Sequence, residues 1–294
     1  MSAASNAALG STLFGGMIAS AMYGLLICQT AWYYRAFPKD PAYLKILIGV
    51  LCVSETIGLV LDYRSVWYYF IQRGIGVDIT TLISCNYWAA AAFFIPTEFT
   101  CFLTELLFIR RMWSLSNQRY FKIGFVVLAP FFVGWGFTIN FLQNMQRHYC
   151  FPQRKANNFS LLMSFGLRIV SSGVVTGTMC FLLYQQASPL ITSRMIQTQR
   201  VVSIVKSLVI GSLSTGLLMW LTSIAFMITY VVIPDSPIPF GIYNTRGSFF
   251  ANAVLVSLND RRRYRRILSE SIVLQNSVVF PSTLDSSRIN RTTE

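Results

Sequence analysis

The segment from Ile242 to Leu268 constrains the fold of this chain more than any other stretch. The apolar run in this segment stops at a dense arginine cluster, made of Arg261, Arg262, Arg263, Arg265 and Arg266. Such a run indicates a transmembrane helix, and the cluster places its end on the cytoplasmic side, where Lys and Arg accumulate. The same arginines are expected to contact anionic lipid headgroups.

The composition extends this interpretation to the whole chain. Only 12% of the 294 residues are charged and 54% are hydrophobic, whereas about 25% of the residues of a typical soluble domain are charged. Several uncharged runs exceed the length of about 20 residues that a helix needs to cross a bilayer. The net charge of +13 comes mostly from residues between these runs. It therefore indicates anchoring in a lipid bilayer and argues against nucleic-acid binding.

We predict an all-α, polytopic membrane protein with seven transmembrane helices in a single domain, residues 1–268. The expected spans lie at about 10–34, 44–70, 80–112, 123–146, 158–186, 207–232 and 240–258. Pro96 is expected to kink the third span. Residues 269–294 are rich in Ser and Thr, and we predict that they form a disordered cytoplasmic tail.

The basic residues decide the orientation of these spans. With the C-terminus in the cytoplasm, 17 Lys and Arg residues fall on the cytoplasmic side and five on the opposite side. This bias predicts an outside N-terminus and a cytoplasmic C-terminus. We expect a multi-pass protein of the plasma membrane.

Motifs in the first, third, sixth and seventh spans form one recognisable pattern. They comprise Tyr23, Gly24, Gln29, Tyr33, Tyr34, Pro38, Asp40, Arg111, Thr215 to Leu217, Asn252, Leu258, Asn259 and Arg261. This pattern resembles a family of fungal (basidiomycete-type) seven-helix membrane proteins known only as a domain of unknown function. The chain departs from the family pattern at Glu105, where the family usually has Gln, and at Gly58 and Arg64, where it tends to have histidines. The resemblance implies a fold and a fungal origin, but no established activity.

Six ionisable residues within the spans are the candidates for a ligand site or for ion pairs: Glu55, Asp62, Glu98, Glu105, Arg168 and Arg246. Buried charges are costly in a membrane and usually face the interior of the bundle. Estimated depth along the spans predicts two ion pairs, Glu98 with Arg168 and Asp62 with Arg246. Such pairs serve either to fix helix register or to line a polar cavity for a ligand or ion.

The sequence leaves two alternatives open for Glu105 and for a pair of cysteines. Glu105 could link to Arg200 or Lys206 at the start of the sixth span, or its carboxylate could reach the headgroup zone. Cys85 and Cys150 both fall on the outer side, where a disulfide could join them, although the sequence cannot fix the connectivity.

Several kinds of chemistry are disfavoured by what the sequence lacks. The single histidine, His148, and the absence of a CxxC spacing argue against a metal site. The seventh span has no lysine for a retinal Schiff base. We therefore expect no metal, no cofactor and no catalytic residue.

The function predicted from these features is that of a receptor-like seven-helix sensor of an unknown ligand, with a cytosolic signalling partner. The alternative is a small-solute or ion transporter that uses the intramembrane Glu and Arg groups. The absence of an internal repeat argues against the transporter.

Overall fold

The computed structural model describes residues 3–68, 71, 88–115, 121–148, 158–192, 217–218, 220–233 and 238–260. The described residues form helices and contain no strand. The named helices are α1 (Ala3–Ala36), α2 (Ala42–Trp67), α4 (Trp88–Ala92), α5 (Phe94–Leu115), α6 (Phe121–His148), α7 (Asn158–Thr192) and α9 (Ile238–Asn259). A further apolar helical segment, Trp220–Val232, precedes α9. The expected all-α fold class is thus confirmed for the described part of the chain.

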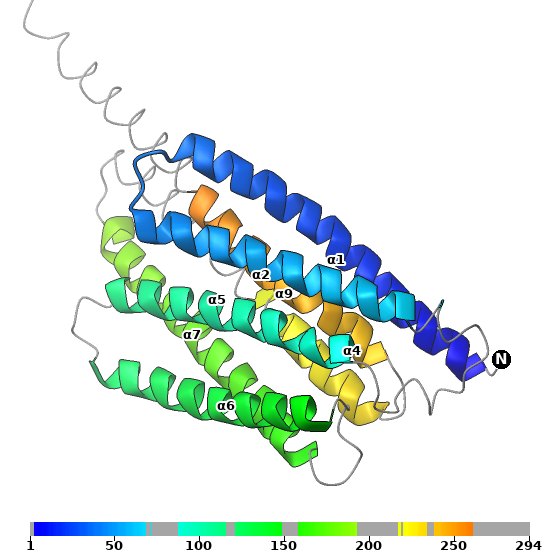
Figure 1. Ribbon diagram of the computed structural model, residues 1–294. Coiled ribbons are helices and arrows are strands. Elements are labelled where there is room, and N and C mark those ends of the chain that lie inside the picture. Colours follow the sequence, from blue (N-terminus) through cyan, green and yellow to red (C-terminus); the bar gives the residue numbers. More distant parts are fainter. Residues whose placement is uncertain are drawn as a thin grey trace, which may run out of the picture.

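The helices form a bundle with α5 at its centre (Figure 1). Helix α5 contacts α2, α6, α7 and α9. Helices α1, α2 and α9 lie together on one side of it, and the α6–α7 pair lies on the other. Because α5 touches both groups, a polar side chain on α5 can bind partners from either side of the bundle.

The predicted third span is divided, which corrects the expectation of one kinked helix over 80–112. Helix α4 ends at Ala92 and α5 begins at Phe94. Pro96 explains this position, because a proline ring clashes with the carbonyl four residues earlier and has no N–H to bond to it. The hydroxyl of Ser54 on α2 donates to the carbonyl of Pro96 at 3.0 Å, which holds α2 against the break.

Helix α2 shows how the sequence orients its faces. Its buried positions are Leu44, Ile48, Leu51, Ser54, Glu55, Gly58, Asp62 and Ser65. The opposite face is apolar yet exposed, with Ile46 at 65% and Val60 at 62% exposure. The two carboxylates therefore point inward, while the exposed face is largely aliphatic, unlike the polar exposed face of a soluble helix. Two described helical stretches, Gly10–Ala36 and Ala42–Trp67, are long and apolar enough to cross a membrane.

A close crossing of α1 and α9 fixes the position of α9. A Cβ atom at Gly15 would collide with the backbone of Gly241, and one at Gly241 would collide with the carbonyl of Ser11. Small residues at such a crossing let two backbones approach closely. The side-chain amide of Asn252 adds a hydrogen bond of 2.9 Å to the carbonyl of Met22.

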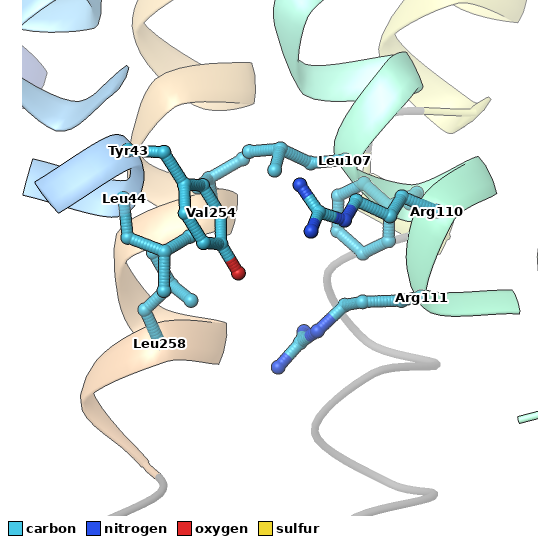
Figure 2. A pocket seen from close by; sticks show the side chains of 8 residues that line it. Tyr43, Leu44, Leu107, Arg110, Arg111, Val254 and Leu258 are labelled. Carbon is cyan, nitrogen blue, oxygen red and sulfur yellow. The ribbon is translucent and has the colours of Figure 1, made fainter. Parts of the chain in front are cut away.

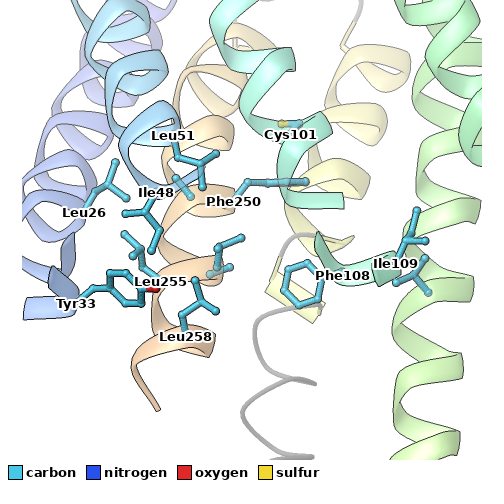
Figure 3. Packing of buried hydrophobic residues seen from close by; sticks show 14 of the residues in the cluster. Leu26, Tyr33, Ile48, Leu51, Cys101, Phe108, Ile109, Phe250, Leu255 and Leu258 are labelled. Carbon is cyan, nitrogen blue, oxygen red and sulfur yellow. The ribbon is translucent and has the colours of Figure 1, made fainter. Parts of the chain in front are cut away.

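Two apolar clusters fill the bundle. The first joins α1, α2, α5, α6, α7 and α9 and includes Leu26, Ile48, Cys101, Phe250 and Leu255 (Figure 3). The second joins α4, α5, α6, α7, α9 and the Trp220–Val232 segment, and it consists of Ala91, Phe93, Phe94, Phe141, Phe165, Phe226 and Tyr243. A layer of charged side chains lies between the two clusters. Along α5, α7 and α9, the residues of the second cluster come before this layer in the sequence, and those of the first cluster come after it.

Candidate functional site

The centre of the charged layer is Glu98 on α5, which is 2% exposed. Arg168 on α7 donates through Nη1 to Oε2 of Glu98, and Arg246 on α9 donates through Nη1 to Oε1 at 3.0 Å. The hydroxyl of Tyr243 donates to the same Oε1 at 2.7 Å. One carboxylate thus receives three donors from two helices. Charge-assisted bonds of this kind are the strong ones in a protein interior.

Glu105 extends the layer by two helical turns along α5. Its Oε1 accepts from Nη2 of Arg168 at 3.3 Å, and its Oε2 accepts from Nε1 of Trp135 at 3.1 Å. The hydroxyl of Ser172 lies 3.4 Å from the same Oε1. Arg168 therefore bridges two carboxylates that lie seven residues apart on one face of α5, as the sequence spacing predicts.

Aromatic rings cover both guanidinium groups. The Cζ atom of Arg168 lies 4.2 Å from the ring centroid of Trp135. The Cζ atom of Arg246 lies 4.9 Å from the centroid of Phe165 and 5.3 Å from that of Phe250. Cations are attracted to ring faces at such distances, and the attraction is strongest where water is excluded. The rings thus stabilise both arginines in a site that is almost fully buried.

The pairing of Arg246 is incomplete. Its Nε and Nη2 atoms are buried and find no hydrogen-bond acceptor within the described part of the chain. The Nε atom of Arg168 is likewise buried without a hydrogen-bond acceptor among the described residues. Buried donors without acceptors are costly, so such atoms mark places where an added acceptor would bind favourably.

A second polar region lies between α2 and α9. The carboxylate of Glu55 accepts from the hydroxyl of Ser248 at 2.7 Å, and Asp62 accepts from Nδ2 of Asn244 at 2.9 Å. Both carboxylates are buried. Among the described residues neither is within ion-pair distance of a cationic group. The donors in this region are therefore neutral, in contrast to those around Glu98.

The structure brings Glu98 and Arg168 together but not Asp62 and Arg246. The predicted Asp62–Arg246 pair is wrong: Arg246 binds Glu98, while Asp62 binds Asn244. Equal depth is not sufficient for pairing, because the rotation of α9 turns Arg246 toward α5 and Asn244 toward α2.

Glu105 also differs from its expected surroundings. It is 6% exposed, in the interior and not in a headgroup zone. Its other predicted partners, Arg200 and Lys206, lie outside the described residues. So do Cys85, Cys150 and the arginine cluster from Arg261 to Arg266, and their predicted roles stay predictions. Cys28, Cys52 and Cys101 are free thiols.

Sequence reasoning missed the neutral members of both regions. Tyr243, Asn244 and Ser248 lie within one and a half turns of Arg246 on α9. A cluster of polar groups around a buried charge was the available signal for them. Trp135 had no such signal, because a lone tryptophan in an apolar run is indistinguishable from a packing residue.

Comparison with known proteins gives one match. Residues 168–263 match the family model described as "Family of unknown function (DUF6534)". The matched region includes both buried arginines but not Glu98. No curated protein and no solved structure matches the chain. The match agrees with a resemblance to a family of unknown function and assigns no activity.

Proposed function

We propose that the protein is a multi-pass plasma-membrane sensor in which the layer formed by Glu98, Arg168 and Arg246 is the switch. Seven spans with an outside N-terminus and a cytoplasmic C-terminus are part of this proposal. The observation that carries it is the position of Glu98, whose single carboxylate joins α7 and α9 to the central helix. A ligand or proton that altered this carboxylate would change the contacts of three helices at once.

The surroundings of the layer support a two-state element. The layer lies between two apolar clusters. In such a low-dielectric interior, a change of charge is weakly screened and strongly alters the interaction energies around it. The unpartnered Nε and Nη2 atoms of Arg246 offer a place for an acceptor group of a ligand. Packed interfaces move between discrete arrangements and do not deform continuously, which a switch requires.

A connection to the inner ends of the helices also supports signalling. Arg111, near the end of α5, donates to the hydroxyl of Ser257 and, at 3.2 Å, to its carbonyl near the end of α9. Helices α5 and α9 are therefore joined both at the charged layer and at their predicted cytoplasmic ends. A rearrangement at Glu98 would reach a cytosolic partner through these two helices. No catalytic step is part of the proposal.

The test is proximity labelling of cytosolic proteins from a labelling enzyme fused to the C-terminus, in a eukaryotic host. Glu98→Gln should change the set of labelled proteins without any ligand, because it releases α7 and α9 from the shared carboxylate. Glu55→Gln is the matched control, since it makes the same chemical change at a carboxylate that forms no ion pair within the part of the chain that the structure describes. Equal labelling by wild type and Glu98→Gln at equal membrane abundance would contradict the sensor.

The second candidate is a cation- or proton-coupled transporter, and the α2–α9 region favours it. Glu55 and Asp62 are buried carboxylates whose partners among the described residues are neutral, and such groups in a membrane mark ion or proton pathways. Proteoliposomes containing a pH-sensitive dye would report proton flux. Flux that disappears in the Glu55→Gln/Asp62→Asn double variant would favour the transporter over the sensor, and its absence in wild type would exclude proton coupling.

A further inference from the structure

A pocket between α2, α5 and α9 lies at the end of the bundle that contains Arg110 and Arg111 (Figure 2). Its volume is about 280 Å³, and its lining residues are Tyr43, Leu44, Leu107, Phe108, Arg110, Arg111, Val254 and Leu258. Arg110 is five residues beyond Glu105, the nearest member of the charged layer, which corresponds to roughly 7.5 Å along the helix axis, and Glu105 is not among the lining residues. The pocket is therefore separate from the charged layer.

The lining of this pocket combines positive charge with an apolar floor. No carboxylate is among its lining residues. The Cζ atom of Arg110 lies 4.5 Å from the ring centroid of Tyr43, and Arg110 is an exposed residue. Arg111 also lines the pocket, and it donates to the hydroxyl and the carbonyl of Ser257. Figure 2 shows both guanidinium groups on the α9-facing side of α5.

An apolar groove lies on the outer faces of α2 and α5. Its volume is about 500 Å³, and its lining residues are Ile46, Gly49, Val50, Val53, Ser54, Ile57, Ile95, Pro96 and Phe99. Spacings of three and four residues place Tyr43, Ile46 and Val50 on one stripe of α2. Arg110 lies 11 residues after Phe99, three helical turns, so these two residues share a stripe of α5. Tyr43 and Arg110, at the exposed edge of the pocket, therefore lie on the same stripes of α2 and α5 as the groove, whereas Arg111 is turned toward Ser257 on α9.

We propose that α2 and α5 together bind one anionic phospholipid, with its phosphate at Arg110 beside Tyr43 and an acyl chain in the groove. A planar guanidinium held by a ring face is suited to a phosphate, because its donors match the oxygen geometry. Basic pockets between membrane helices on the cytoplasmic side bind anionic headgroups. The groove supplies the apolar surface that a free phosphate would not use. This site is independent of the proposed sensor or transporter activity.

Lipid binding is tested on the purified full chain in detergent by native mass spectrometry with dioleoyl phosphatidic acid. Wild type should bind this lipid more tightly than dioleoyl phosphatidylcholine, which has the same acyl chains. Arg110→Gln should weaken phosphatidic acid binding at least about fivefold, the loss expected for one arginine at a phosphate. Arg64→Gln, the same change at the exposed far end of α2, should leave it unchanged.

Two further arms separate the lipid from other sources of phosphate. Glycerol 3-phosphate has the headgroup alone and should bind far more weakly than the lipid. Val53→Trp fills the groove from its exposed side and should weaken binding of the lipid but not of glycerol 3-phosphate. Thermal unfolding without added lipid checks that each variant folds. Equal losses in Arg110→Gln and Arg64→Gln, or full binding by Val53→Trp, would overturn the proposal.

Discussion

Two buried carboxylate regions in one bundle are stabilised by different means. Around Glu98 the partners are the cations Arg168 and Arg246, whereas Glu55 and Asp62 on α2 have the hydroxyl of Ser248 and the amide of Asn244. The first region is charge-balanced and joins three helices. The second retains carboxylates without a described counter-cation. The same residue type thus acts as a structural junction in one place and offers a proton or cation site in the other.

The largest effect should follow from removing Arg168. Arg168→Met leaves Glu98 with one cation and Glu105 with none among the described residues. Breaking a buried pair by removing one partner costs about 3–5 kcal/mol, because it leaves an uncompensated buried charge. The measurement is thermal or denaturant unfolding in detergent, together with the folded yield. Adding Glu105→Gln should recover part of the loss, because Glu105 is the carboxylate left unpaired, whereas adding Glu98→Gln should deepen it, because Arg246 then loses its carboxylate. Wild-type stability in Arg168→Met would show that the layer does not hold the bundle together.

Glu98→Gln should give the next largest effect, about 3 kcal/mol. Arg168 keeps Glu105, but Arg246 loses the only carboxylate that it contacts in the described structure. If the two regions are stabilised differently, Glu98→Gln lowers the free energy of unfolding more than Glu55→Gln does. Equal unfolding free energies for Glu98→Gln and Glu55→Gln would remove the distinction between the two regions.

Gly247→Ala tests the packing of the second region. A Cβ atom there would lie 2.5 Å from Oε1 of Glu55, so the carboxylate would have to move. Overpacking of this kind costs about 1–3 kcal/mol. Gly166→Ala on α7 is the matched control, because nothing lies within 4 Å of its Cβ position. A helix-interior Gly-to-Ala change with free space should gain about 0.5–1 kcal/mol. Similar unfolding midpoints for the two variants would contradict the close Glu55–α9 contact.

The smallest effects should come from Glu55→Gln and Asp62→Asn. The amide oxygen of each variant can accept the bond that Ser248 or Asn244 donates, and no ion pair seen among the described residues is broken. We expect changes below about 1 kcal/mol, with a gain if removing the buried charge outweighs the altered packing. Unfolding in detergent measures the stability, and the proton-flux assay measures the function. A large loss of stability would reveal a cation partner for these carboxylates.

Much of the helical architecture could be predicted from the sequence, because apolar run length and proline positions act locally. The expected spans at 123–146 and 240–258 lie within α6 and α9. The break before Pro96 was predicted only as a kink, since its severity depends on how neighbouring helices pack there, as Ser54 of α2 does through its bond to the Pro96 carbonyl. The number of spans and their orientation stay predictions.

The candidate site was half predictable for a similar reason. Glu98 and Arg168 were matched by depth, which counting along each helix supplies. Asp62 and Arg246 were matched in the same way, and that pair does not form. Depth fixes only one coordinate, whereas pairing also depends on which way each helix face turns.

The sequence by itself determined that these chain segments are apolar helices and that the acidic and basic groups within them must be compensated, because hydrophobicity and charge are properties of single residues. The tertiary structure alone decided that Glu98 is shared by two arginines and that Glu55 and Asp62 have neutral partners. The close glycine crossing of α1 and α9 contributes to this outcome, since it fixes where α9 lies and therefore which residues face α5. Partner choice is set by the lateral packing and rotation of whole helices, which no single segment encodes.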